Sequence, residues 1–112
     1  MVTTASDLHQ TITAFVALLS RSIRVEVLIL YGSYVNGAPD EWSDIDVAVI
    51  SPDFMGIPMW ERQRIISRAT LDRDPSLAPI GYPSSEYHNP GRHSFLREIV
   101  RTGRVVYAAP AS

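Results

Sequence analysis

Two β-branched apolar runs, close together in the chain, most constrain what this sequence can fold into. Residues 24–31 read RVEVLILY, and residues 44–50 read DIDVAVI. The first run is almost continuously apolar, which is typical of a buried strand. In the second run Asp44 and Asp46 alternate with apolar residues, so the pattern predicts a strand that carries both carboxylates on one face.

The remaining chain alternates between helix and strand patterns. It predicts helices over 7–20, 59–72 and 94–102, short strands over 77–80 and 105–108, a loop over 52–58 and a turn-rich segment over 82–91. This order predicts an α/β (α+β) layer structure, with a small mixed sheet and helices packed on one side. Without repeats or a linker, residues 1–112 are expected to form a single domain.

The composition of the chain argues against several classes of function. The chain has no Cys, which excludes thiol chemistry and a Cys-based zinc site. Its net charge is -2, which argues against non-specific nucleic-acid binding. No apolar run is long enough to span a bilayer and no signal peptide is visible, so we expect a cytoplasmic protein without membrane contact.

The two residues after the first strand, Gly32 and Ser33, suit an anion. Gly32 has no Cβ, so a ligand can approach its backbone closely, and Ser33 adds a hydroxyl donor beside main-chain N–H groups. The stretch is neither a P-loop nor a dinucleotide fingerprint, because Gly-x-x-x-x-Gly-Lys and Gly-x-Gly-x-x-Gly are both absent.

The acidic pair suits a cation. Two carboxylates at i and i+2 on a strand repel each other and are penalised by desolvation unless a cation offsets them. Hard oxygen ligands favour Mg²⁺, whose coordination is normally completed by water and substrate phosphates. A phosphate cradle and a carboxylate pair on successive strands are the parts needed for metal-assisted phosphoryl or nucleotidyl transfer. An α/β domain with an unrelated metal site is an alternative reading of the same pair.

The Gly-Ser pair and the acidic pair together form a more specific pattern than either pair alone. Ten residues separate Gly32-Ser33 from Asp44-Ile45-Asp46, within the stretch YGSYVNGAPDEWSDIDVAVIS. This stretch resembles the minimal nucleotidyltransferases of the DNA polymerase β superfamily, in particular the type paired with HEPN-domain toxins in toxin–antitoxin modules. The segments SPDFMGI, APIGYPSSEY and FLREIVRTGRVVY also resemble that family, so the likeness extends over nearly the whole chain.

The resemblance implies a polymerase-β-like fold and a role for each matching residue. Gly32 and Ser33 would hold the triphosphate of ATP, with Ser43 beside the metal site. Asp44 and Asp46 would be the catalytic, metal-binding pair, with Mg²⁺ as cofactor. The implied reaction is AMP transfer from ATP to a hydroxyl, a tyrosine of a cognate HEPN toxin, with which the chain would form a hetero-oligomer as its antitoxin.

One position departs from the family pattern. The family usually supplies a third carboxylate from the next strand, and the match through LAPIGY puts Ala78 there. Asp72, Asp74 and Glu86 are the neighbouring candidates for a substitute. Because a missing general base lowers a rate by about 10²–10⁴-fold, a second hypothesis is an antitoxin that neutralises its partner by binding alone.

Overall fold

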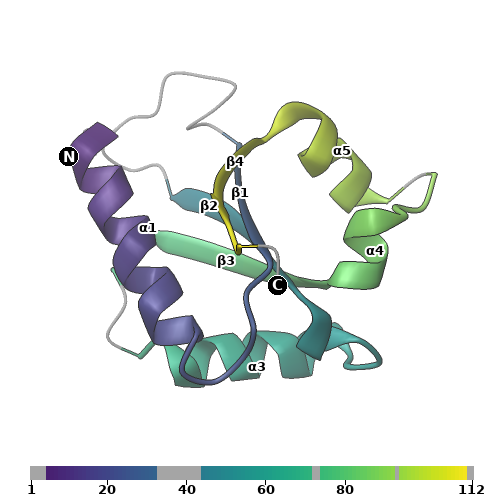
Figure 1. The fold of residues 1–112 in the computed structure, drawn as a ribbon, viewed down its shortest axis with the longest axis horizontal. Coiled ribbons are helices and arrows are strands. Elements are labelled where there is room, and N and C mark those ends of the chain that lie inside the picture. Colours follow the sequence, from purple (N-terminus) through teal and green to yellow (C-terminus); the bar gives the residue numbers. More distant parts are fainter. Residues whose placement is uncertain (1–4, 33–43, 72–73, 93, 111–112) are drawn as a thin grey trace.

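The computed structural model describes residues 5–32, 44–71, 74–92 and 94–110. Along the chain (Figure 1) the elements are α1 (Ala5–Leu19), β1 (Val27–Tyr31), β2 (Ile45–Ser51), the short 3-10 helix η1 (Pro52–Phe54), α3 (Met59–Ala69), β3 (Leu77–Pro83), α4 (Ser84–His88), α5 (Phe95–Thr102) and β4 (Arg104–Ala108). Among these described residues, no helix is both long and apolar enough to cross a membrane.

The strands form one mixed sheet in the order β3-β2-β1-β4. β1 is antiparallel to both of its neighbours, whereas β2 and β3 are parallel and joined through η1 and α3. The register places Tyr31 of β1 on one side of Asp46 and Ala78 of β3 on the other. Asp46 therefore lies in an inner strand with a neighbour on each side.

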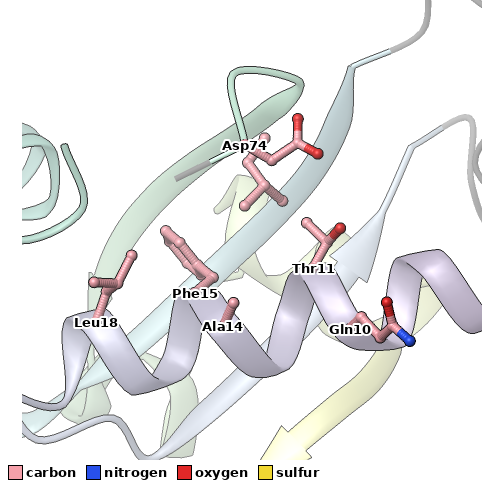
Figure 2. A pocket seen from close by; sticks show the side chains of 7 residues that line it. Gln10, Thr11, Ala14, Phe15, Leu18 and Asp74 are labelled. Carbon is pink, nitrogen blue, oxygen red and sulfur yellow. The ribbon is translucent and has the colours of Figure 1, made fainter. Parts of the chain in front are cut away.

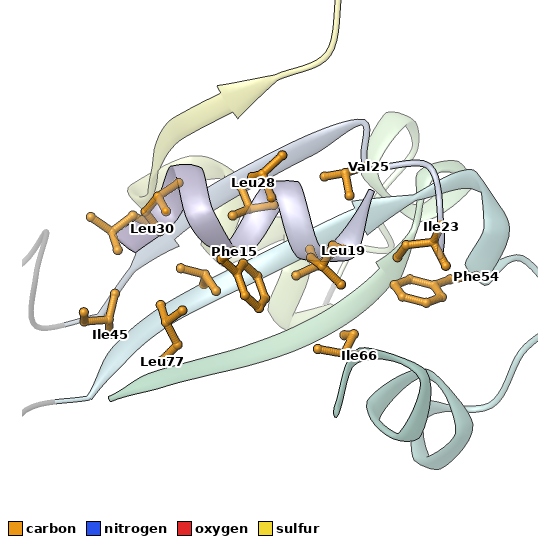
Figure 3. Close-up of a cluster of buried hydrophobic side chains, with 14 residues drawn as sticks. Phe15, Leu19, Ile23, Val25, Leu28, Leu30, Ile45, Phe54, Ile66 and Leu77 are labelled. Atoms are coloured by element: carbon orange, nitrogen blue, oxygen red, sulfur yellow. The ribbon is translucent and has the colours of Figure 1, made fainter. Parts of the chain in front are cut away.

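One face of the sheet is covered by α1 and α3. Figure 3 shows Phe15 and Leu19 of α1 and Ile66 of α3 packed over side chains of the strands. The strand residues of this cluster alternate along the chain, as expected for one face of a pleated sheet: Leu28, Leu30, Ile45, Val47, Val49 and Leu77.

The other face is covered by α4 and α5. Leu96 and Ile99 of α5 are buried against the intervening strand residues, Val27, Ile29, Ala48 and Ile50. The mixed sheet is thus confirmed, but the expectation of helices on one side is wrong, since helices lie on both faces (Figure 1). The strands are apolar on both faces, so the sheet excludes water only when helices cover each face.

The expected strand over 77–80 continues to Pro83 in the structure, because it pairs with β2 along its whole length, and side chains of α3 bond its other edge. Gln63 Nε2 donates to Pro79 O at 2.8 Å, and Gly81 N donates to Gln63 Oε1 at 3.0 Å. Arg62 Nη1 donates to Gly81 O at 3.1 Å. These contacts occupy the outer edge of β3 as a further strand would, and an edge strand tolerates the prolines within β3.

Candidate functional site

The acidic pair lies where β2 begins. Asp46 is the second residue of β2 and is partly buried, whereas Asp44 immediately precedes the strand and is exposed. Ile45 N donates to Ser76 O at 2.8 Å, which ties the start of β2 to the segment that leads into β3. Because Asp46 shares its face with Ala48 and Ile50, it lies on the side of the sheet that α5 covers.

Gly32 lies against the Asp46 carboxylate. It follows β1 directly, with φ at +78°, a backbone region that favours glycine. A Cβ at this position would lie 2.3 Å from Asp46 Oδ2, which is too close for any atom. The backbone conformation of the turn therefore favours glycine, and any other residue would also force the Asp46 carboxylate to shift.

Burial and charge both act on Asp46. Burial raises the pKa of the Asp46 carboxyl, and the negative charge of Asp44 raises it further. Within the described part of the chain, no side chain forms a salt bridge or hydrogen bond with Asp46 that would offset these effects. A carboxylate in this position favours a bound cation.

Tyr31 provides a hydroxyl beside the pair. Burial, followed by the charge of Asp46 and the proximity of Tyr82, raises the pKa of Tyr31 to about 12, so its phenol is neutral at physiological pH. The ring contacts Phe95 of α5 edge-to-face, with ring centroids 5.8 Å apart. This contact joins the end of β1 to the first turn of α5.

A pocket of about 400 Å³ opens between the sheet and α5. Its floor is formed by Tyr31, Gly32 and Asp46, and its wall by residues of α5: Phe95, Glu98, Ile99 and Thr102. The larger part of its lining is apolar, with carboxylates at two points. Such a pocket suits an aromatic or aliphatic group that presents a polar atom to Asp46.

The structure places Ala78 directly opposite Asp46 in the parallel β2–β3 pair, on the same face of the sheet. Asp74 does not supply the carboxylate that is missing at position 78. It bonds Ser76 and lines a different pocket with residues of α1, as Figure 2 shows. Glu86 lies in α4, which begins after the far end of β3. Asp72 lies outside the described residues.

The structure brings some of the predicted site residues together. Gly32, Asp44 and Asp46 lie together, while the predicted nucleotide-binding residues Ser33 and Ser43 fall outside the described residues. The contribution of α5 was missed. Its sequence shows an amphipathic helix, but only the packing of that helix on β1 brings Glu98 and Thr102 to the pocket.

The acidic pair fits a hard divalent cation in its donor chemistry, because both groups are carboxylates and Asp46 has no compensating partner among the described residues. Across the described ranges, no cluster of three Asp, Glu or His side chains could enclose a metal ion. A cation held here would need water or substrate oxygens to complete its coordination.

The mixed sheet, with an acidic pair at the start of an inner strand and a glycine turn beside it, defines a polymerase-β-like nucleotidyltransferase fold. The family model described as "Polymerase beta, Nucleotidyltransferase" matches residues 14–111. The chain belongs to this nucleotidyltransferase family.

Named relatives agree with this assignment. The chain is 32% identical, over 71% of its length and 77% of the relative's, to a Methanocaldococcus jannaschii protein named "Putative protein adenylyltransferase". A crystal structure described as a "putative nucleotidyltransferase" from Sulfolobus solfataricus superposes with a TM-score of 0.67 at 16% identity, covering 89% of this chain and 79% of the other. A toxin–antitoxin structure with AMP-PNP matches with a TM-score of 0.52 at 25% identity, covering 90% and 73%.

Proposed function

We propose that this chain is an Mg²⁺-dependent protein adenylyltransferase that moves AMP from ATP to a tyrosine hydroxyl of a HEPN-domain toxin and thereby acts as an antitoxin. The observation that carries the proposal is the acidic pair, Asp44 and Asp46, at the start of β2 beside the Gly32 turn, in a member of this family.

The relatives support the choice of reaction and partner. One is named a protein adenylyltransferase, and a toxin–antitoxin structure that contains AMP-PNP shares the fold. The pocket beside Asp46 also suits a phenol, since Tyr31, Phe95 and Ile99 give it an apolar lining. The net charge of -2 is consistent with a protein acceptor.

Each residue of the site has a distinct role in the proposed reaction. The open backbone at Gly32, with Ser33 and Ser43, would bind the triphosphate, and Asp44 and Asp46 would hold the metal. Bound Mg²⁺ would neutralise charge on the phosphates and align the attacking and leaving oxygens. Asp46 would orient this assembly from an inner strand, and α5 would contact the acceptor from the opposite wall of the pocket.

The test is intact-mass spectrometry of a purified HEPN-domain toxin after incubation with this protein, ATP and Mg²⁺. We expect the toxin to gain one or more AMP units, and the variant carrying both Asp44→Ala and Asp46→Ala to transfer none. Omission of Mg²⁺ should have the same effect as the double substitution. Transfer that survives the double substitution would show that the acidic pair is not the catalytic centre.

Ala78 favours a second candidate, an antitoxin that neutralises the toxin by covering its surface. The position opposite Asp46 carries a methyl group where the family usually has a carboxylate, and loss of that group would weaken catalysis. In this case complex formation and neutralisation survive substitution of both aspartates. A variant that still binds the toxin but no longer neutralises it would rule out this candidate and favour the transferase.

A further inference from the structure

The strand next to the acidic pair lacks a carboxylate at the position that faces it. β3 runs parallel to β2, and the residue that pairs with Asp46 is Ala78. If the chain transfers AMP, another group must accept the proton of the attacking hydroxyl, or the reaction proceeds at a reduced rate. The remaining walls of the same pocket are where a substitute carboxylate could contact the acceptor.

Glu98 is the other carboxylate that lines this pocket in the described part of the chain. It lies in the middle of α5, across the pocket from the floor formed by Tyr31, Gly32 and Asp46. It does not belong to a three-residue metal cluster with the acidic pair. Its position therefore suits contact with an acceptor in the pocket and not a third bond to the same metal.

α5 is held firmly in place over β1. Leu96 and Ile99 are almost fully buried in the core on that face. At the end of the helix, a Cβ on Gly103 would lie 2.7 Å from Ile29 Cγ2 and 2.9 Å from Leu30 O, so only glycine permits this approach. The close contact fixes the position of Glu98 relative to the end of β1.

Glu98 is also kept charged. Arg101, one turn later, hydrogen-bonds the Glu98 carboxylate through Nε, at 3.2 Å, and through Nη2. These bonds lower the pKa of Glu98, so the carboxylate is ionised at neutral pH but is a weaker base while Arg101 holds it. Arg101 lines the neighbouring pocket, which Glu98 also borders, so the Glu98 carboxylate must leave Arg101 to reach an acceptor beside Asp46.

We propose that Glu98 of α5 supplies the acidic group that β3 lacks, acting as the general base on an acceptor hydroxyl bound between α5 and Asp46. This inference rests on the proposed AMP transfer. The acceptor O–H bond breaks as its proton passes to Glu98, and the oxygen forms a bond to the α-phosphorus of ATP. The bond from that phosphorus to the bridging oxygen breaks, pyrophosphate leaves with the electron pair, and Glu98 returns its proton to water.

The test compares Glu98→Gln with two matched controls, with radiolabelled ATP and a purified HEPN-domain toxin as probes. We expect Glu98→Gln to lower kcat by about 10²–10⁴-fold with little change in the KM for ATP. Arg101→Gln breaks the same ion pair but keeps the base, and Glu61→Gln breaks the equivalent Glu61–Arg64 pair on α3. Both controls should transfer AMP at close to the wild-type rate.

A rescue experiment separates a catalytic role of Glu98 from a purely structural one. Because residue 78 faces Asp46, Ala78→Asp in the Glu98→Gln background should recover transfer, whereas Ala78→Asn should not. Equal losses in Glu98→Gln and Arg101→Gln would assign the effect to the ion pair and overturn the inference. Wild-type rates in Glu98→Gln would overturn it as well, while leaving the proposed function intact. Absence of transfer by the wild-type chain would overturn both.

Discussion

Gly32 shows how a single residue can serve two requirements at once. Its positive φ disfavours any other residue, and the missing side chain leaves room for the Asp46 carboxylate. Gly56, in the turn after η1, has a similar φ of +75° but no atom within 4 Å of its missing Cβ. The two glycines therefore allow the backbone requirement to be measured apart from the contact with Asp46.

We expect Gly56→Ala to lower the free energy of unfolding by about 1–2 kcal/mol, the cost of a left-handed conformation in an L-residue. Gly32→Ala should lower it further, because the new methyl group must displace the Asp46 carboxylate. Thermal melts with and without Mg²⁺ measure both effects. Mg²⁺ should still stabilise Gly56→Ala but not Gly32→Ala. Equal behaviour of the two variants would contradict a role for the contact with Asp46.

Asp46 should reduce stability when no metal is bound. Its pKa is raised above the ordinary 3.8, so the folded chain holds the proton more tightly than the unfolded chain does. The stabilising contribution of the protonated group is complete below pH 3.8 and is lost as pH rises through the raised pKa. At neutral pH the ionised group therefore opposes folding.

In metal-free buffer at pH 7, Asp46→Asn should consequently melt at a higher temperature than the wild type, and the difference should shrink as the pH is lowered toward 3.8. Added Mg²⁺ should raise the Tm of the wild type and leave Asp46→Asn unchanged. Asp44→Asn serves as the control, because it removes the repulsion from an exposed position and should give a smaller gain. A variant less stable than the wild type at pH 7 would contradict this assignment.

Among the elements, β2 and β3 show what the sequence alone could predict. β2 was expected over 44–50 and is observed over Ile45–Ser51, because the alternation of aspartates with apolar residues encodes its position directly. β3 was expected only to residue 80, yet it continues to Pro83. Its last residues pair with β2, and Gly81 is also bonded by the side chains of Gln63 and Arg62, which lie far away in the sequence.

The outer edge of β3 should therefore depend on Gln63. Replacement by Ala removes two hydrogen bonds at a partly buried edge, and we expect a loss of about 1–3 kcal/mol in the free energy of unfolding by urea denaturation. Gln10→Ala, at an exposed position on α1, is the control and should change stability by less than about 0.5 kcal/mol. Equal effects at the two positions would show that the edge contacts are not stabilising.

Across the whole molecule, the sequence alone could predict only those neighbouring positions of the candidate site that are encoded locally. Gly32 directly follows β1, while Asp44 and Asp46 lie at the start of β2, and their joint pattern in the sequence predicted a shared site. Glu98 could not be found in this way, because its place depends on the packing of α5 against β1. The coverage of both faces of the sheet likewise depends on tertiary packing, which strand and helix periodicities do not specify.

The overall charge allows a prediction about partners. With ten basic and twelve acidic residues, the chain should show no measurable affinity for nucleic acid at physiological salt. Fluorescence anisotropy with labelled single-stranded and duplex DNA is the measurement, and the purified HEPN-domain toxin is the positive control. Binding to DNA that weakens steeply as salt is increased would reveal a basic surface and contradict the prediction.

The different directions of the strand pairs also bear on the order in which the molecule assembles. β1 and β2 are antiparallel and close in sequence, so pairing Tyr31 with Asp46 closes a short loop at a small entropic cost. Pairing Asp46 with Ala78 requires a parallel crossover through α3, and such non-local contacts form more slowly. As the chain emerges during synthesis, the strands that carry Gly32 and the aspartates can meet before β3 and α5 exist to enclose them.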